Sequence, residues 1–99
     1  MIARIWHGRT KADHYEAYTN FMRERAIPDY QSTDGFVDLS FLRKVDGDIA
    51  HFKLITYWEN LDVIKNFAGE DFEKAKYYPE DDNYLIEFPE FVEHYEVFS

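Results

Sequence analysis

Three of the four histidines lie in segments whose composition predicts β-strands, and they are the first candidates for chemistry. An imidazole titrates near neutral pH, so it can accept a proton from a substrate or bind a metal. We expect His7 or His51 to act as a general base that removes a phenol proton from a bound molecule. The competing interpretation is a buried histidine hydrogen-bonded to backbone or to a tyrosine. With the strand order given below, we expect these two and His94 to approach the same end of one sheet. No spacing forces them to converge, however, so no metal site is predicted.

Aromatic side chains form the second candidate group. Nine Phe, eight Tyr and two Trp make up 19% of 99 residues, although a small domain has limited interior to hold them. Ligand pockets and subunit interfaces both use such rings. The residues expected to bind a substrate are Trp6, Tyr18, Phe21, Met22, Phe67, Tyr77, Tyr78 and His94. The same spacing also suits a plain hydrophobic core.

Charged residues supply further candidates. The acidic stretch 80–83 lacks the glycine and alternating ligands of a calcium loop, so we expect a solvated loop that acts as a lid beside Tyr77 and Tyr78. A substrate carboxylate would find a partner among the arginines, although pairing with the many acids of the chain is the simpler expectation. The arginines considered are Arg4, Arg9, Arg23, Arg25 and Arg43.

The composition excludes several classes of function. Twenty acidic and eleven basic residues give a net charge of −9, which disfavours nucleic acids and anionic membranes as partners. The chain has no Cys, so it has neither disulfides nor a thiolate nucleophile. No apolar run is long enough for a membrane span or a signal peptide, and we expect a cytoplasmic protein.

The elements that must position these residues follow from hydrophobic spacing. Strands are expected over residues 2–9, 36–44, 49–59 and 91–98, and helices over 11–27 and 61–68, with a helical turn at 71–77. Thr10 is the expected N-cap of the first helix, and Pro28 its end. Asp46-Gly47 predicts a hairpin turn. Asn60 and Gly69 are expected to cap the second helix at its two ends.

This order of elements predicts a single α+β domain over residues 1–99, with the ferredoxin-like βαββαβ topology. Right-handed crossovers then place the four antiparallel strands in the order four, one, three, two. Apolar residues occur on both faces of the second and third strands, whereas a solvent-exposed face should be polar. A second copy of the sheet would cover that face, so we expect a homodimer with its sheets packed face to face.

The run 52–61, FKLITYWENL, is followed by Ile64, Phe67 and the run 70–75, EDFEKA. With the strand start at Gly35-Phe36, it resembles the core of the antibiotic biosynthesis monooxygenase (ABM) domain family. The resemblance implies a dimeric α+β barrel with a pocket between the helices and the sheet of each subunit. It also implies an oxidoreductase, a monooxygenase that oxygenates a small aromatic or polycyclic substrate without a cofactor. The alternatives are a non-catalytic protein that binds a small hydrophobic ligand, and a structural dimer.

Haem-degrading enzymes form another branch of this family, and the sequence departs from them at two positions. Where those enzymes carry an iron-binding His, the matching stretch 75–77 ends in Tyr77. Where they carry an Asn late in the first strand, the nearest counterpart is His7. Because both positions differ, the sequence does not favour haem as a cofactor.

Overall fold

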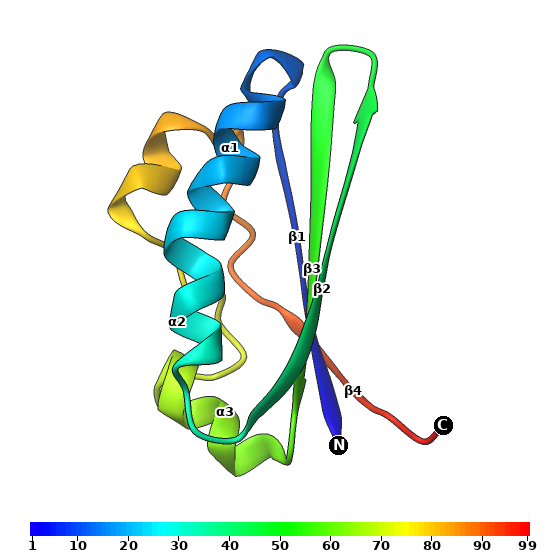
Figure 1. The fold of residues 1–99 in the computed structure, drawn as a ribbon, viewed down its shortest axis with the longest axis vertical. Coiled ribbons are helices and arrows are strands. Elements are labelled where there is room, and N and C mark those ends of the chain that lie inside the picture. Colours follow the sequence, from blue (N-terminus) through cyan, green and yellow to red (C-terminus); the bar gives the residue numbers. More distant parts are fainter.

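A four-stranded antiparallel sheet forms the base of the molecule in the computed structural model, which describes residues 1–99 (Figure 1). The strands are β1 (Ile2–Lys11), β2 (Phe36–Asp46), β3 (Ile49–Trp58) and β4 (Glu93–Glu96), and they lie in the order β2-β3-β1-β4. The expected α+β topology and strand order are therefore confirmed. β4 is shorter than the predicted strand 91–98.

The helices all lie on one face of the sheet, and the other face has no element over it (Figure 1). The first helical stretch comprises a 3₁₀ turn (Ala12–His14), α1 (Tyr15–Phe21), a π-helical segment (Met22–Ala26) and α2 (Ile27–Gln31). The second helix is α3 (Leu61–Ala68), and the 3₁₀ helix η3 (Pro79–Asn83) packs beside α1. None of these helices has the length and apolar content that crossing a membrane would require.

The first helical stretch does not end at Pro28, as predicted, but continues to Gln31. A proline lacks the N–H of the regular helical hydrogen bond, and its ring clashes with the carbonyl one turn earlier. The turn over Met22–Ala26 is π-helical, which widens the backbone just before the proline. Pro28 then stands in the first turn of α2, where a missing N–H is tolerated.

The start of that stretch also differs from the prediction. Thr10 is not an N-cap, because β1 continues to Lys11 and Thr10 is fully buried within it. Gly8 lies inside the strand instead of ending it. A Cβ at Gly8 would lie 2.0 Å from the indole of Trp6, so this position has room only for glycine. Trp6 therefore packs flat along its own strand.

The turns around the second half of the sheet are confirmed. Gly47 adopts φ +63° in the β2–β3 hairpin, a conformation that residues with a Cβ adopt rarely. Asn60 accepts a hydrogen bond from the Val63 backbone N–H at 3.0 Å and so caps α3. Gly69 ends the same helix with φ +84°.

Two predictions for the segment that follows α3 are only partly correct. The expected turn over 71–77 is limited to its start, where the Lys74 N–H donates to the Asp71 carbonyl at 2.9 Å. The backbone then pairs with residues 90–92: the N–H of Ala75 donates to the Glu90 carbonyl, and the Val92 N–H donates to the Glu73 carbonyl. Residues 80–83 belong to the 3₁₀ helix η3 and do not form a loop. Asp82 and Asn83 are exposed, as expected, but Asp81 is only 3% exposed.

Strand alternation divides the sheet into two chemically different faces. The even-numbered residues of β1 and β3 point toward the helices and make up much of the core. The odd-numbered residues from Ile5 to Arg9 and from Ile49 to Tyr57 point to the uncovered face, here called the open face. Each side chain of these strands therefore belongs to only one face.

Candidate functional site

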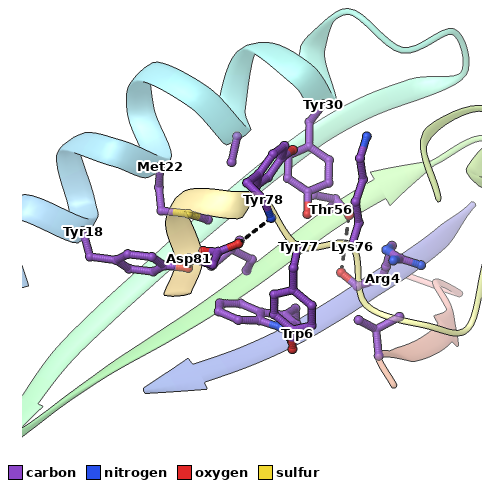
Figure 2. Close-up of a pocket in the computed structure, with 13 residues that line it drawn as sticks. Arg4, Trp6, Tyr18, Met22, Tyr30, Thr56, Lys76, Tyr77, Tyr78 and Asp81 are labelled. Atoms are coloured by element: carbon purple, nitrogen blue, oxygen red, sulfur yellow. Dashed lines mark hydrogen bonds between the residues drawn. The ribbon is translucent and has the colours of Figure 1, made fainter. Parts of the chain in front are cut away.

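A cavity of about 20 Å³ lies between the helices and the covered face of the sheet (Figure 2). Most of its wall is aromatic or apolar, from Trp6, Tyr18, Met22, Ala26, Tyr30, Leu54, Tyr77, Tyr78 and Val92. The polar residues that line it are Arg4, Thr56, Lys76 and Asp81. This volume has room for about one water molecule. The aromatic side chains therefore fill most of the space between the layers.

Five of the residues predicted to bind a substrate line this cavity: Trp6, Tyr18, Met22, Tyr77 and Tyr78. The other three do not. Phe67 stacks on Tyr30 within the core, with ring centroids 4.2 Å apart, and Phe21 packs against Tyr18 and Tyr78. His94 lies in β4, beyond Arg4.

His7 and His51 lie together, but on the open face. The His7 Nε2 atom is 3.2 Å from the His51 Nδ1 atom, and their rings are stacked with centroids 5.4 Å apart. Partial burial, and then the neighbouring His51, lowers the pKa of His7. Because the sheet lies between these rings and the cavity, neither can accept a proton from a molecule bound there.

His94 occupies a third environment. Its Nε2 atom is 3.2 Å from the Arg4 Nη1 atom, and its ring meets Phe72 edge to face. Burial, followed by the charge of Arg4, lowers the pKa of His94. The three strand histidines therefore do not converge, and the structure contains no cluster of three metal-binding side chains.

Asp81 provides an acidic group at one end of the cavity, beside Tyr18 (Figure 2). Its Oδ1 atom accepts a hydrogen bond from the Tyr18 hydroxyl at 2.9 Å, and its Oδ2 atom accepts one from the Tyr78 backbone N–H at 2.7 Å. Burial raises the pKa of Asp81, although both hydrogen bonds act to lower it. The sequence analysis missed this residue. The available signal was Pro79, which favours a helix start and makes Asp81 a capping residue.

Arg4 and Lys76 lie at the other end of the cavity (Figure 2). The Arg4 Nη1 atom donates to the Phe72 carbonyl, and Nη2 donates to the Lys74 carbonyl at 3.0 Å. The Lys76 ammonium donates to Asp29 at 2.9 Å and to the Phe67 carbonyl at 3.3 Å. The cavity is thus acidic at one end and cationic at the other.

Residues 76–83, here called the cover, close the cavity. Tyr77 accepts a hydrogen bond from the Trp6 indole N–H at 3.2 Å and donates one to the Pro89 carbonyl. The Tyr78 hydroxyl donates to Asp29 at 2.5 Å. Asp29 on α2 therefore accepts from two residues of the cover, Tyr78 and Lys76. Burial acts to raise the pKa of Asp29, but these two donors hold it below its usual value.

Comparison with solved structures identifies the fold. The chain superposes on a candidate antibiotic biosynthesis monooxygenase from Nitrosomonas europaea with a TM-score of 0.71 and 16% identity over 100% of both chains. A second such protein, from Bacillus cereus, gives 0.67 and 16% identity over 99% of this chain and 95% of that one. A mutant of MhuD, solved with two manganese protoporphyrin IX molecules per active site, gives 0.61 and 15% identity over 98% and 94%.

No family model and no curated protein matches the sequence itself. The similarity is therefore one of structure, and it extends over nearly the whole length of all three neighbours. The chain has the fold of the antibiotic biosynthesis monooxygenases, as its sequence resemblance to that family predicted.

Proposed function

We propose that the protein is a monooxygenase that oxygenates a small aromatic molecule in the cavity between its helices and its sheet, without a bound cofactor. The observation that supports this function is Asp81, a buried carboxylate of raised pKa within an aromatic wall. Such a carboxylate is a stronger base than an exposed one, because burial disfavours its charged form. The fold shared with candidate monooxygenases is a second support.

The proposed reaction begins when Asp81 accepts the hydroxyl proton of a bound phenol. The phenolate then transfers one electron to dioxygen, and the resulting radical and superoxide combine at a ring carbon. Asp81 returns its proton to form a hydroperoxide. Loss of the ring-carbon hydrogen and cleavage of the O–O bond then release water and leave a quinone-type carbonyl. The surrounding rings exclude bulk water from these charged species.

Asp81 replaces His7 and His51 as the proposed proton acceptor within one subunit. Those two histidines point to the open face, so a ligand of the cavity meets neither ring. Asp81 lines the cavity directly. Its neighbour Tyr18 donates to the carboxylate and holds it in place.

Binding of an aromatic molecule requires the cover to move. A cavity of about 20 Å³ has no room for a ring, whereas displacement of Tyr77 and Tyr78 would open it. The cover is held by hydrogen bonds to Asp29, Trp6, Tyr18 and the Pro89 carbonyl, and by ring contacts of Tyr77 and Tyr78. Opening breaks the contacts of Tyr77 and Tyr78, as in other segments that gate buried sites.

Oxygen consumption with hydroxynaphthalene probes tests the proposal. We expect wild-type protein to consume oxygen and Asp81→Asn to lose at least about a hundredfold in rate while its probe affinity stays within about tenfold. His7→Gln serves as the control and keeps the wild-type rate. Binding without turnover in the wild type would instead identify a non-catalytic binding protein. Loss of turnover in His7→Gln alone would overturn the role of Asp81.

Haem does not fit the residues present. The neighbour MhuD was solved with manganese protoporphyrin IX, but here the stretch that would supply an iron ligand ends in Tyr77. The Tyr77 hydroxyl already bonds Trp6 and the Pro89 carbonyl. The proposed reaction therefore does not involve haem.

A homodimer through the open face is the proposed assembly. Apolar side chains occupy one half of that face on adjacent strands: Ile5, Ile55, Tyr57 and Tyr95, with Leu42 beside them opposite Lys53. Leu42 and Tyr95 are about half exposed. A second copy would remove these surfaces from water. Sedimentation at micromolar concentration tests this, and a stable monomer would contradict it.

A further inference from the structure

Arg4 is a buried cation without an acidic partner. It is 3% exposed, and none of the ion pairs in the structure includes it, although the chain has twenty acidic residues. A buried charge is normally paired, because removal from water is costly unless an opposite charge compensates it. The environment of Arg4 therefore lacks the counter-charge that such a site usually contains.

The hydrogen bonds of Arg4 satisfy part of its guanidinium but do not neutralise it. Nη1 and Nη2 donate to two backbone carbonyls, and Nη1 also lies against the ring of His94. All three partners carry no negative charge, and the Nε–H has no protein partner. A guanidinium presents a planar fork that matches a carboxylate. A donor of that fork thus remains free beside the cavity that Arg4 lines.

The opposite end of the cavity has the opposite charge. Asp81 lies beside Tyr18, whereas Arg4 and Lys76 lie beyond Trp6 and Tyr77 (Figure 2). Asp81 would repel an anionic group placed near it, and Arg4 would attract one. This charge asymmetry would favour one orientation of a ligand that has a single anionic group.

We propose that the cavity binds an aromatic molecule bearing a carboxylate or a similar anion, with the anion on Arg4 and a neutral hydroxyl at Asp81. This assignment rests on the cavity of the proposed function and adds the charge class of its ligand. The anion compensates the buried guanidinium and leaves the hydroxyl within reach of the proposed base. Lys76, at the same end, is already paired with Asp29 at 2.9 Å, so Arg4 is the cation of this cavity that lacks a counter-charge.

A purely structural role for Arg4 makes a different prediction. Its bonds to the Phe72 and Lys74 carbonyls fix that loop against β1, and this function needs no ligand. The net charge of −9 then disfavours any anionic ligand, because the protein as a whole repels it. An anion-binding role therefore predicts tighter binding of an anionic ligand than of a neutral one, whereas a purely structural role predicts the reverse.

Calorimetric binding of a matched pair of probes, 6-hydroxy-2-naphthoate and its uncharged amide, tests the proposal, because their two substituents stand at opposite ends of the ring system. We expect the carboxylate to bind wild-type protein at least about tenfold more tightly, the size of one charge-assisted hydrogen bond. Arg4→Gln should reduce this ratio to about twofold or less. Arg23→Gln removes an equal charge from an exposed position on the helical stretch and should keep the wild-type ratio.

Arg4→Lys keeps the charge but loses the planar fork, so it provides a second variant should Arg4→Gln fail to fold. We expect it to lower the ratio by about threefold. Equal binding of both probes to the wild type, or a ratio that neither Arg4 variant changes, overturns the anion site and leaves the cavity as a binding site for neutral rings. Failure of both probes to bind overturns the anion site and the proposed function together.

Discussion

The two faces of the sheet are built from alternate residues of the same strands, yet they differ in almost every property. Trp6 lines the covered cavity, while the next residue, His7, is exposed on the open face. The covered face contains the buried acid, the buried cation and the aromatic wall. The open face pairs an apolar half with a basic half. Neighbours in the sequence therefore serve separate surfaces, and the sheet keeps their chemistry apart.

The basic half of the open face stands out on a chain with a net charge of −9. Antiparallel register brings its residues side by side: His7 pairs with Lys53, Arg9 with His51, and His51 with Lys44. A shallow concavity lies among four of them. The covered face, in contrast, has one acidic and one cationic end within a single cavity. The charges of the open face lie at the surface, whereas Arg4 and Asp81 line a cavity.

The largest loss of stability is expected from a substitution in the buried core on the covered face. Trp58 is 0% exposed and contacts Phe36, Tyr30 and Phe67 ring to ring. Trp58→Ala should lower the free energy of unfolding by about 3–5 kcal/mol, because it leaves a large void among these rings. Urea denaturation monitored by circular dichroism measures the change.

The neighbour of Trp58 in the sequence lies on the open face and is the matched control. Tyr57 is half-buried and points away from the helices, so Tyr57→Ala should lower the unfolding free energy of an isolated subunit by less than half as much. Equal losses at both positions would show that the two faces are equally buried. That result would remove the contrast on which both proposals for the faces depend.

The open face should respond strongly only when a second copy covers it. Ile5 pairs with Ile55 in its apolar half, so Ile55→Asp would place a charge in the proposed dimer interface. We expect the dimer dissociation constant to rise on the order of a hundredfold, with an unchanged circular dichroism spectrum. Val45→Asp, at an exposed position outside that face, serves as the control in sedimentation. An equal loss of dimer in both variants would place the interface elsewhere.

Much of this fold could be predicted because its turns and helix caps depend on only a few neighbouring residues. The hairpin glycine Gly47 and the caps Asn60 and Gly69 have conformations that short-range chemistry imposes. The helix after Pro28 was missed for the same reason. A proline normally ends a helix, and only the π-helical turn before it, which has no short sequence signature, allows α2 to follow.

The site was harder to predict because it depends on strand register and on contacts far apart in the sequence. Two of the aromatic residues predicted to bind a ligand, Trp6 and Tyr77, line the cavity, and their hydrogen bond joins two sides of it. The faces of His7 and His51 could not be assigned, since a shift of one residue in either strand reverses the direction of its side chains. Asp81 was concealed among exposed acids, and only its contact with Tyr18, 63 positions away, marks it as buried.

A smaller effect is expected at the contact that holds the cover on the covered face. Asp29 accepts from Lys76 and Tyr78, so Asp29→Asn should weaken both hydrogen bonds and lower the unfolding free energy by about 1 kcal/mol. Amide hydrogen exchange over residues 76–83 should then accelerate more than exchange in β3. Asp62→Asn, at an exposed residue of α3, is the control. Uniform acceleration would show a general loss of stability and no gate at the cover.

The smallest effect is expected from pH at the open face. Partial burial, His51, Lys53 and Arg9 lower the pKa of His7, while Glu87 opposes them. An unfolded chain then binds more protons than the folded one below about pH 6.5, so this group makes the fold less stable as the pH falls through that range. His7→Gln should therefore show a smaller decrease in unfolding free energy between pH 8 and pH 5.5 than the wild type does. His94, whose pKa is also lowered, remains in both proteins and contributes equally. Identical decreases in unfolding free energy for the two proteins would mean that His7 has the same pKa in the folded and unfolded chains. The neighbouring charges of the open face would then not shift that pKa.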